Sequence, residues 1–377
     1  ALMVACQDGH EEVVKLLLAH KKVDPNIQDN NGLSPLMIVC ADGNEEVVKL
    51  LLDHKKVDPN IKRNDGCTSL MAACENGNVE IVKLLLEHEA MDPNTKNKSR
   101  VTGLMIACLN GQEEVVKLLL AHEKIDPDFQ SNKGTTAFMM ACDCGHEEIV
   151  KLLLNHKKVD PNVQSNVGFT ALMFACQEGH TEIVELLLAY EAIDPNLQDK
   201  EGWTLLMQAC RNKCAEVVRL LLAHEKIDPN IESIGLTPLI IACGKDHAEI
   251  TNLLLAHKDM DPNTKNKCGV SALMLACQSG HVEIMQLLLA HENMDPNICN
   301  DNGYSALMFA CREGRTEVIK SLLKYGVLLD IVNNDGNTAL AIAKKENHKN
   351  IIDLIEKYKA CSVCKKSTKN RCGVCMS

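Results

Sequence analysis

The sequence predicts an all-helical solenoid of stacked repeats, and two observations carry that prediction. Ten cysteines recur along the chain, with every step between neighbours 34 residues long except one of 33. Self-similarity at a fixed period of this size is typical of repeat proteins. The chain of 377 residues is too long for one globular core but suits an architecture that grows by adding repeats. The recurring cysteines are Cys6, Cys40, Cys74, Cys108, Cys142, Cys176, Cys210, Cys243, Cys277 and Cys311.

Residues 168–201 represent the repeating unit. Gly168 opens a turn, and Thr170 is placed to cap a first helix, ALMFACQE, which ends at Gly179. A second helix follows, with a wide apolar face of isoleucine, valine and leucine. The Asp-Pro-Asn turn at residues 194–196 ends that helix. Because one such unit cannot bury its own apolar side, the units must stack.

We expect about eleven such units in one continuous solenoid over residues 1–358. Residues 1–31 form the tail of a first unit, and a last, partial unit begins at Gly336. Because Ala1 lies inside a repeat, we expect the chain to be a fragment at its N-terminus. The nine full units open at Gly32, Gly66, Arg100, Gly134, Gly168, Gly202, Gly235, Gly269 and Gly303.

The pattern G-x-S/T-P/A-L-M-x-A-C-x-x-G-H-x-E-I-V-x-L-L-L resembles the ankyrin repeat. The resemblance implies paired antiparallel helices and β-hairpin turns that project at right angles to form a concave, partner-binding face. One departure is systematic, because methionine replaces the signature histidine, whose hydrogen bonds to neighbouring backbone must be absent or replaced. These methionines are Met3, Met37, Met71, Met105, Met139, Met173, Met207, Met274 and Met308.

The recurring cysteines are predicted to be buried free thiols. Equivalent residues in adjacent helices lie ~8–10 Å apart, which exceeds the ~7 Å between Cα atoms that a disulfide allows. We therefore expect a reducing, intracellular location, cytoplasmic or nuclear. No run approaches the ~20 apolar residues of a membrane helix.

The charge balance and the absence of catalytic motifs exclude several functions. The formal net charge is −11, and the basic residues after Glu356 leave the preceding body more acidic still. An acidic body argues against nucleic acid, whose phosphates require a basic surface. No nucleophile-and-base pattern, phosphate loop or metalloprotease motif is present. We therefore expect a monomer that is not an enzyme and binds neither nucleic acid nor membrane.

Eight histidines near the ends of second helices could suggest a metal site. We favour helix capping, since a partial positive charge is favourable at a helix C-terminus and neighbouring histidines are too far apart to share one zinc. These residues are His20, His54, His88, His122, His156, His224, His257 and His291.

Protein binding is predicted at the hairpin tips. Trp203, the only tryptophan, follows an opening glycine, as do Phe169 and Tyr304, and Arg211 lies nearby. Tryptophan, tyrosine and arginine dominate interface energetics. The alternative is that the aromatic side chains merely pack on the next hairpin. A second apolar row follows the signature methionines and either packs in the core or lines the concave groove: Val4, Ile38, Ile106, Met140, Phe174, Ile241, Leu275 and Phe309.

Residues 359–377 differ in kind from the repeats. Cys361, Cys364, Cys372 and Cys375 form C-x2-C-x7-C-x2-C among lysines, and two such pairs favour zinc over incidental thiols. CSVCKKSTKNRCGVC resembles the first half of a MYND-type zinc finger. That resemblance implies that each pair serves a different zinc ion, that further ligands follow Ser377, and that the finger binds proline-rich peptides.

The predicted function is therefore a protein-interaction scaffold with a concave ankyrin face and a zinc-binding peptide-recognition module. Two alternatives remain open. The chain could be the regulatory arm of an enzyme whose catalytic part lies beyond Ser377, or a mechanical spacer with no specific ligand.

Overall fold

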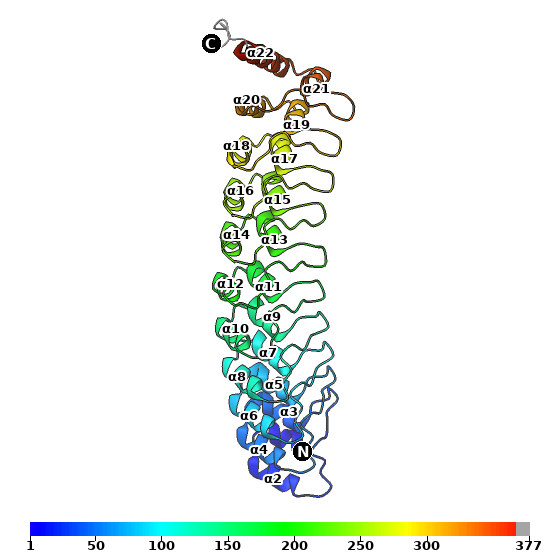
Figure 1. Cartoon of the computed structure of the whole chain (residues 1–377). Helices are drawn as coiled ribbons and strands as arrows, with labels where there is room; N and C mark the ends of the chain where they lie inside the picture. Colours follow the sequence, from blue (N-terminus) through cyan, green and yellow to red (C-terminus); the bar gives the residue numbers. More distant parts are fainter. Residues whose placement is uncertain (367–377) are drawn as a thin grey trace. The chain divides into compact units, whose positions relative to one another are not determined.

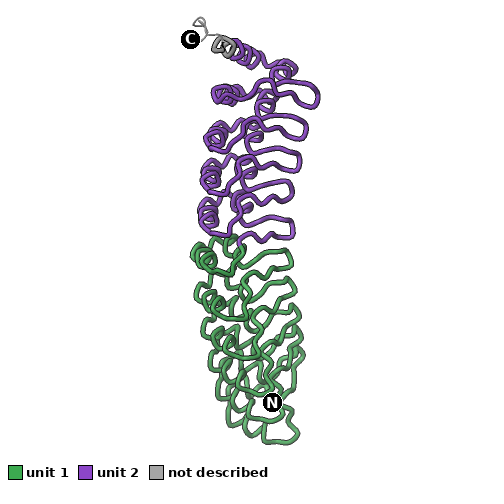
Figure 2. Tube along the Cα trace, in the orientation of Figure 1, with its two compact units in different colours: residues 1–194 green, residues 195–377 purple. Residues whose placement is uncertain are grey.

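The computed structural model describes residues 1–366, with side chains described for residues 1–360. Over these residues it contains twenty-two helices and no strand, and the predicted all-helical solenoid is confirmed. The chain divides into two compact units, residues 1–194 and residues 195–377 (Figure 2). In each unit the odd-numbered first helices lie between the even-numbered second helices and the loops (Figure 1).

Unit 1 contains six helix pairs, each formed by the two halves of one repeat. Its first helices pack on one another, and its second helices do the same. The helices are α1 (Leu2–Gln7), α2 (Glu11–Leu18), α3 (Pro35–Asp42), α4 (Glu45–Leu52), α5 (Ser69–Asn76), α6 (Val79–Glu87), α7 (Gly103–Leu109), α8 (Glu113–Ala121), α9 (Ala137–Asp143), α10 (Glu147–Leu154), α11 (Ala171–Glu178) and α12 (Thr181–Leu188).

Unit 2 contains the remaining five pairs, packed in the same manner. Its last helix continues past residue 358, the end predicted for the solenoid. Within the described residues, no helix combines the length and the apolar character that crossing a membrane requires. The helices are α13 (Leu205–Arg211), α14 (Ala215–Leu222), α15 (Pro238–Gly244), α16 (Ala248–Leu255), α17 (Ala272–Ser279), α18 (Val282–Ala290), α19 (Ala306–Arg312), α20 (Thr316–Tyr325), α21 (Ala339–Lys345) and α22 (Lys349–Lys366).

The first helices begin and end as the repeat pattern predicts. The Met173 N–H donates to Thr170 Oγ1 at 3.3 Å, which satisfies one of the free backbone donors at the start of α11. At the end of α11, Gly179 adopts a left-handed conformation with φ of 78°. Lys213, which replaces glycine in the seventh repeat, has the same kind of backbone conformation, with φ of 61°. Five hairpins of the described residues close through an isolated β-bridge, such as Lys96 with Thr102.

The recurring cysteines and methionines form the core between repeats. Nine of the ten cysteines are buried, whereas Cys176 is only half-buried. All cysteines in the described part of the chain are free, as predicted. Burial raises the pKa of Cys6 to about 11 and that of Cys243 to about 12, which keeps both thiols protonated and unreactive.

Side chains at the start of second helices form hydrogen bonds with the preceding repeat. His180 Nε2 lies 3.0 Å from the Asp143 carbonyl of the preceding repeat, and Asn78 Nδ2 donates to the Cys40 carbonyl at 2.9 Å. In unit 2, Arg315 Nε donates to the Gln278 carbonyl at 2.9 Å. Each bond satisfies a carbonyl near the end of a first helix, where intrahelical partners are missing.

A second set of bonds joins the Asp-Pro-Asn turns of adjacent repeats, and we call it the asparagine ladder. Asn94 Nδ2 donates to the Lys124 carbonyl at 2.7 Å, and its Oδ1 accepts from the Asp126 N–H at 2.9 Å. One amide therefore satisfies a donor and an acceptor in the next repeat. The same double contact is made by Asn26, Asn60, Asn162, Asn196, Asn230 and Asn263.

Asp128 interrupts this ladder, because it stands where the other turns have asparagine. Its Oδ2 accepts from the Asp160 N–H at 2.9 Å, whereas its Oδ1 is buried and has no partner. The equivalent acceptor in the next repeat is the Lys158 carbonyl, and an ionised carboxylate has no hydrogen to donate to it. Burial, with smaller effects from Asp160 and Asp126, raises the pKa of Asp128 to about 6.

Replacing Asp128 by asparagine is expected to stabilise the fold at neutral pH by about 1–2 kcal/mol, because the amide supplies the missing donor. The advantage should shrink as the pH falls from about 6 towards about 4, since only the folded chain then binds a proton at Asp128. Denaturant unfolding of wild type and Asp128→Asn across this pH range measures the difference. The reciprocal change, Asn162→Asp, should lower the free energy of unfolding by a similar amount, one repeat later. A pH-independent difference would contradict this account.

Candidate functional site

The residues that follow the opening glycines lie where the hairpins meet the first helices. All nine are half-buried. In seven of them the backbone N–H donates to a side chain four residues earlier, as where the Trp203 N–H donates to Asp199 Oδ1 at 2.8 Å. The Cys67 N–H instead donates to Asp65 Oδ1, and the Leu236 N–H to the Ser233 carbonyl. The nine residues are Leu33, Cys67, Val101, Thr135, Phe169, Trp203, Leu236, Val270 and Tyr304.

The second apolar row lies beside these tip residues and does not belong uniformly to core or surface. Val4 is 59% exposed, Ile241 and Phe309 are each 6% exposed, and the other members are half-buried. In unit 1 the Phe169 ring meets the Phe174 ring edge-on, with centroids 5.6 Å apart. Phe169 therefore packs on the first helix of its own repeat, and the pair presents a half-buried aromatic surface.

Trp203 and Arg211 are brought together in unit 2, as the sequence predicts. The Arg211 guanidinium lies 5.2 Å from the centre of the Trp203 ring, at the C-terminal end of α13. Asp199 holds the tryptophan backbone through one carboxylate oxygen and accepts from Gln208 Nε2 through the other at 3.0 Å. Arg211 is exposed and Trp203 is half-buried, so part of the pair is accessible to a partner.

Tyr304 forms a similar stack in unit 2 with an arginine that sequence reasoning missed. The Arg312 guanidinium lies 5.7 Å from the Tyr304 ring centre and 5.1 Å from that of Phe309. The two rings are themselves 5.7 Å apart. The signal that could have found Arg312 is its position, because it follows the repeat cysteine directly, as Arg211 does.

Phe129 in unit 1 is a further aromatic residue that the sequence analysis missed. Lys96 Nζ and the Arg100 guanidinium lie 4.8 and 5.0 Å from its ring centre. Arg100 replaces an opening glycine and keeps a positive φ of 59°. Its Nε also donates to the Gln130 carbonyl at 3.3 Å. The unusual backbone at Arg100 therefore carries a side chain that stacks on the neighbouring turn.

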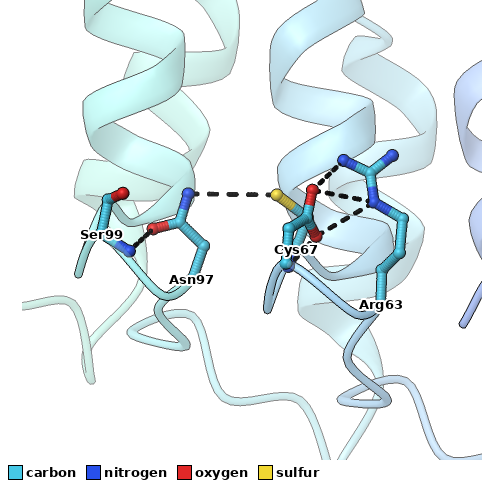
Figure 3. Close-up of polar contacts among 5 residues, drawn as sticks. Arg63, Cys67, Asn97 and Ser99 are labelled. Carbon is cyan, nitrogen blue, oxygen red and sulfur yellow. Dashed lines mark hydrogen bonds and ion pairs between the residues drawn. The ribbon is translucent and has the colours of Figure 1, made fainter. Parts of the chain in front are cut away.

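Polar side chains also connect neighbouring hairpins of unit 1 (Figure 3). Asn97 Nδ2 lies 3.9 Å from Cys67 Sγ, and Asn97 Oδ1 accepts from the Ser99 N–H at 2.9 Å. Arg63 forms an ion pair with Asp65, and this contact holds the pKa of the Asp65 carboxyl well below its usual range. These contacts order the hairpin tips beside the candidate surface.

The histidines at the ends of second helices contact the backbone of the turn that follows. The Nδ1 atoms of His54 and His224 accept the N–H two residues later, at 3.4 and 3.2 Å. The described residues include no group of three or more His, Cys, Asp or Glu placed to hold a metal ion.

The predicted zinc ligands lie outside the part of the chain whose side chains are described. Cys361 and Cys364 fall in the last turns of α22, where only the backbone is described. Cys372 and Cys375 lie beyond residue 366, outside the described residues. The zinc site therefore stays a prediction.

Comparison with known proteins identifies the repeats. A family model described as ankyrin repeats (three copies) matches residues 2–97, 89–165, 156–233, 226–298 and 273–367. A crystal structure of EF0377, an ankyrin repeat protein, is 31% identical with a TM-score of 0.48, and the match covers 51% of this chain and 98% of that one. No curated protein matches the chain.

Removing the Arg211 side chain is expected to uncover Trp203. Because Trp203 is the only tryptophan and the guanidinium covers its ring, Arg211→Ala should increase acrylamide quenching of the intrinsic fluorescence. Arg312→Ala is the matched control, since Arg312 stacks on Tyr304 and Phe309 instead. Equal quenching in wild type and Arg211→Ala would show that the stack does not form in solution.

Proposed function

Because the chain belongs to the ankyrin-repeat family, whose members are generally non-enzymatic binding scaffolds, we propose that it binds a partner protein through its hairpin tips and first helices. This is the face that the ankyrin resemblance predicts to be concave. The family supports the scaffold role in general, and the rows of half-buried side chains support this face in particular.

The Trp203–Arg211 stack is the observation that carries the proposal. Trp203 is only partly buried by the fold, and an exposed guanidinium lies over its ring. Tryptophan and arginine are the side chains most enriched among residues that dominate binding energy. Phe169 with Phe174 in unit 1, and Tyr304 with Arg312 in unit 2, present the same kind of aromatic surface.

Trp203→Ala is expected to weaken partner recovery at least about tenfold, the loss typical of a binding hot spot. The measurement is quantitative cross-linking and mass spectrometry of cell extract on immobilised wild-type and variant chains, with Phe169→Ala and Tyr304→Ala tested in parallel. Tyr190→Ala is the control, because Tyr190 is an exposed aromatic residue at the end of a second helix. A partner profile unchanged by all three variants would favour the spacer role.

A regulatory arm of a larger enzyme is the alternative function. In that case the partner of this surface would be a catalytic domain of the same protein. Expressing the protein with and without the coding sequence beyond Ser377 distinguishes the scaffold from the enzyme arm. Only an enzyme arm would change a catalytic activity associated with the longer chain.

The four C-terminal cysteines support a second binding module, which we propose to be a MYND-like zinc finger at residues 359–377. Two C-x2-C pairs supply four thiolates, the donor set that structural zinc prefers. Cys361 with Cys364 would hold one ion and Cys372 with Cys375 another, each completed by ligands beyond Ser377. The expected partner of this module is a proline-rich peptide.

Zinc analysis of the chain extended past Ser377 is expected to give two ions per chain. Cys361→Ser with Cys364→Ser should remove one ion, and Cys372→Ser with Cys375→Ser the other, because each pair serves its own zinc. Cys67→Ser with Cys268→Ser controls for other accessible thiols, since both cysteines lie in the repeats. Absence of zinc from the extended chain would refute the module.

A further inference from the structure

We propose that the Trp203–Arg211 stack is a receptor for a carboxylate, and that the partner bound there presents an acidic segment. The inference rests on the proposed function and adds the chemistry of the partner. Three observations support it. Arg211 has no carboxylate partner among the described residues, and the similar stack of Arg312 in the same unit has one. The charges along the first helices also differ between the two units.

The chemistry of a stacked arginine favours carboxylate binding. A guanidinium that lies over an aromatic ring keeps its N–H groups, which can donate two parallel bonds to one carboxylate. Arg211 is exposed, and no carboxylate among the described residues pairs with it. The carboxylate of Asp199 in the same hairpin is already engaged by the Trp203 N–H and by Gln208.

The second stack in unit 2 contains the carboxylate that the first one lacks. Arg312 stacks on Tyr304, and its Nε donates to Glu313 Oε1 at 3.0 Å. Glu313 directly follows Arg312, and the corresponding residue after Arg211 is the neutral Asn212. The two residues have the same backbone conformation, with φ and ψ of −88° and 3° at Glu313 and of −89° and 3° at Asn212. Glu313 therefore occupies the place that a partner's carboxylate would take at Arg211.

The charges around Arg211 agree with an acidic ligand. At the two positions after the repeat cysteine, the only charged residues in the repeats of unit 1 are acids: Asp8, Asp42, Glu75, Asp143 and Glu178. In unit 2 the same positions carry Arg211, Lys245 and Arg312, with Glu313 as the one acid. Lys213 and Lys245 are both exposed beside this row. Unit 1 has 18 basic and 30 acidic residues, whereas unit 2 has 22 and 21, with six of its basic residues in the C-terminal segment 357–371.

The expected ligand combines an acidic side chain with a neighbouring apolar one. The carboxylate binds the Arg211 edge, and the apolar side chain packs on the part of the Trp203 ring that Arg211 leaves open. Nucleic acid would also bring anionic oxygens to this edge, and competition with single-stranded oligonucleotides distinguishes that source from a protein carboxylate.

A displayed library of random peptides, selected on the full chain, tests the proposal. Selected peptides should contain Asp or Glu next to a large apolar residue, and their affinity is measured by the fluorescence of Trp203, the only tryptophan. Replacing the acid of a peptide by its amide should weaken binding at least about tenfold, as expected for a charge-assisted contact. Arg211→Gln should abolish this difference between acid and amide, whereas Arg219→Gln, an exposed arginine on the second helix α14, should preserve it.

Asn212→Glu is the decisive variant, because it recreates beside Arg211 the pair that Arg312 makes with Glu313. It should also abolish the preference for the acidic peptide, while Asn212→Gln, of the same size and uncharged, should keep it. Thermal unfolding of all four variants checks that the fold is intact. Selected peptides without an acid, displacement by oligonucleotide, or an undiminished preference in Arg211→Gln or Asn212→Glu would overturn the inference. The proposed function would still stand if partner recovery continued to depend on Trp203.

Discussion

No repeat of this chain can bury its own apolar surface, and the rest of the structure depends on that constraint. The first helices of each unit pack on one another through a layer of leucine, methionine and cysteine, and the second helices do the same. Because the layer between repeats is thin, small and flexible side chains fill it and aromatic residues are scarce. Some of the few aromatic residues present, such as Trp203 and Phe169, lie half-buried at the hairpin tips, whereas Phe138 is buried in the core.

Polar side chains add order to this apolar stack by joining each turn to the next repeat. Asn94 makes two such bonds, and His180 satisfies a helix-end carbonyl across the repeat boundary. These contacts are directional, so they fix the register between neighbours more narrowly than apolar contact alone. At Asp128, where an acid stands in place of asparagine, the apolar layers remain intact and one carboxylate oxygen has no hydrogen bond.

The repeat period, the helix caps and the buried cysteines followed from the sequence because each depends on a local pattern that recurs. Trp203 and Arg211 could be grouped for the same reason, since they lie eight residues apart in one repeat. The pairing of Arg312 with Glu313 and the stacking of Arg100 on Phe129 could not be predicted, because they depend on side-chain directions that the pattern does not encode. The unpartnered Asp128 oxygen required knowing which carbonyl the neighbouring turn presents.

The bonds of the asparagine ladder have an evolutionary consequence. Within unit 1, Asn26 reaches Lys56 and Asn60 reaches Ala90, so each asparagine acts at the same offset along the chain. Duplication or loss of one whole repeat would therefore rejoin equivalent donors and acceptors, and the scaffold would survive the change. The tip residues would be shuffled by the same event. Duplication or loss of a repeat can therefore change the residues of the recognition surface in a single genetic step, while the hydrogen bonds of the asparagine ladder are kept.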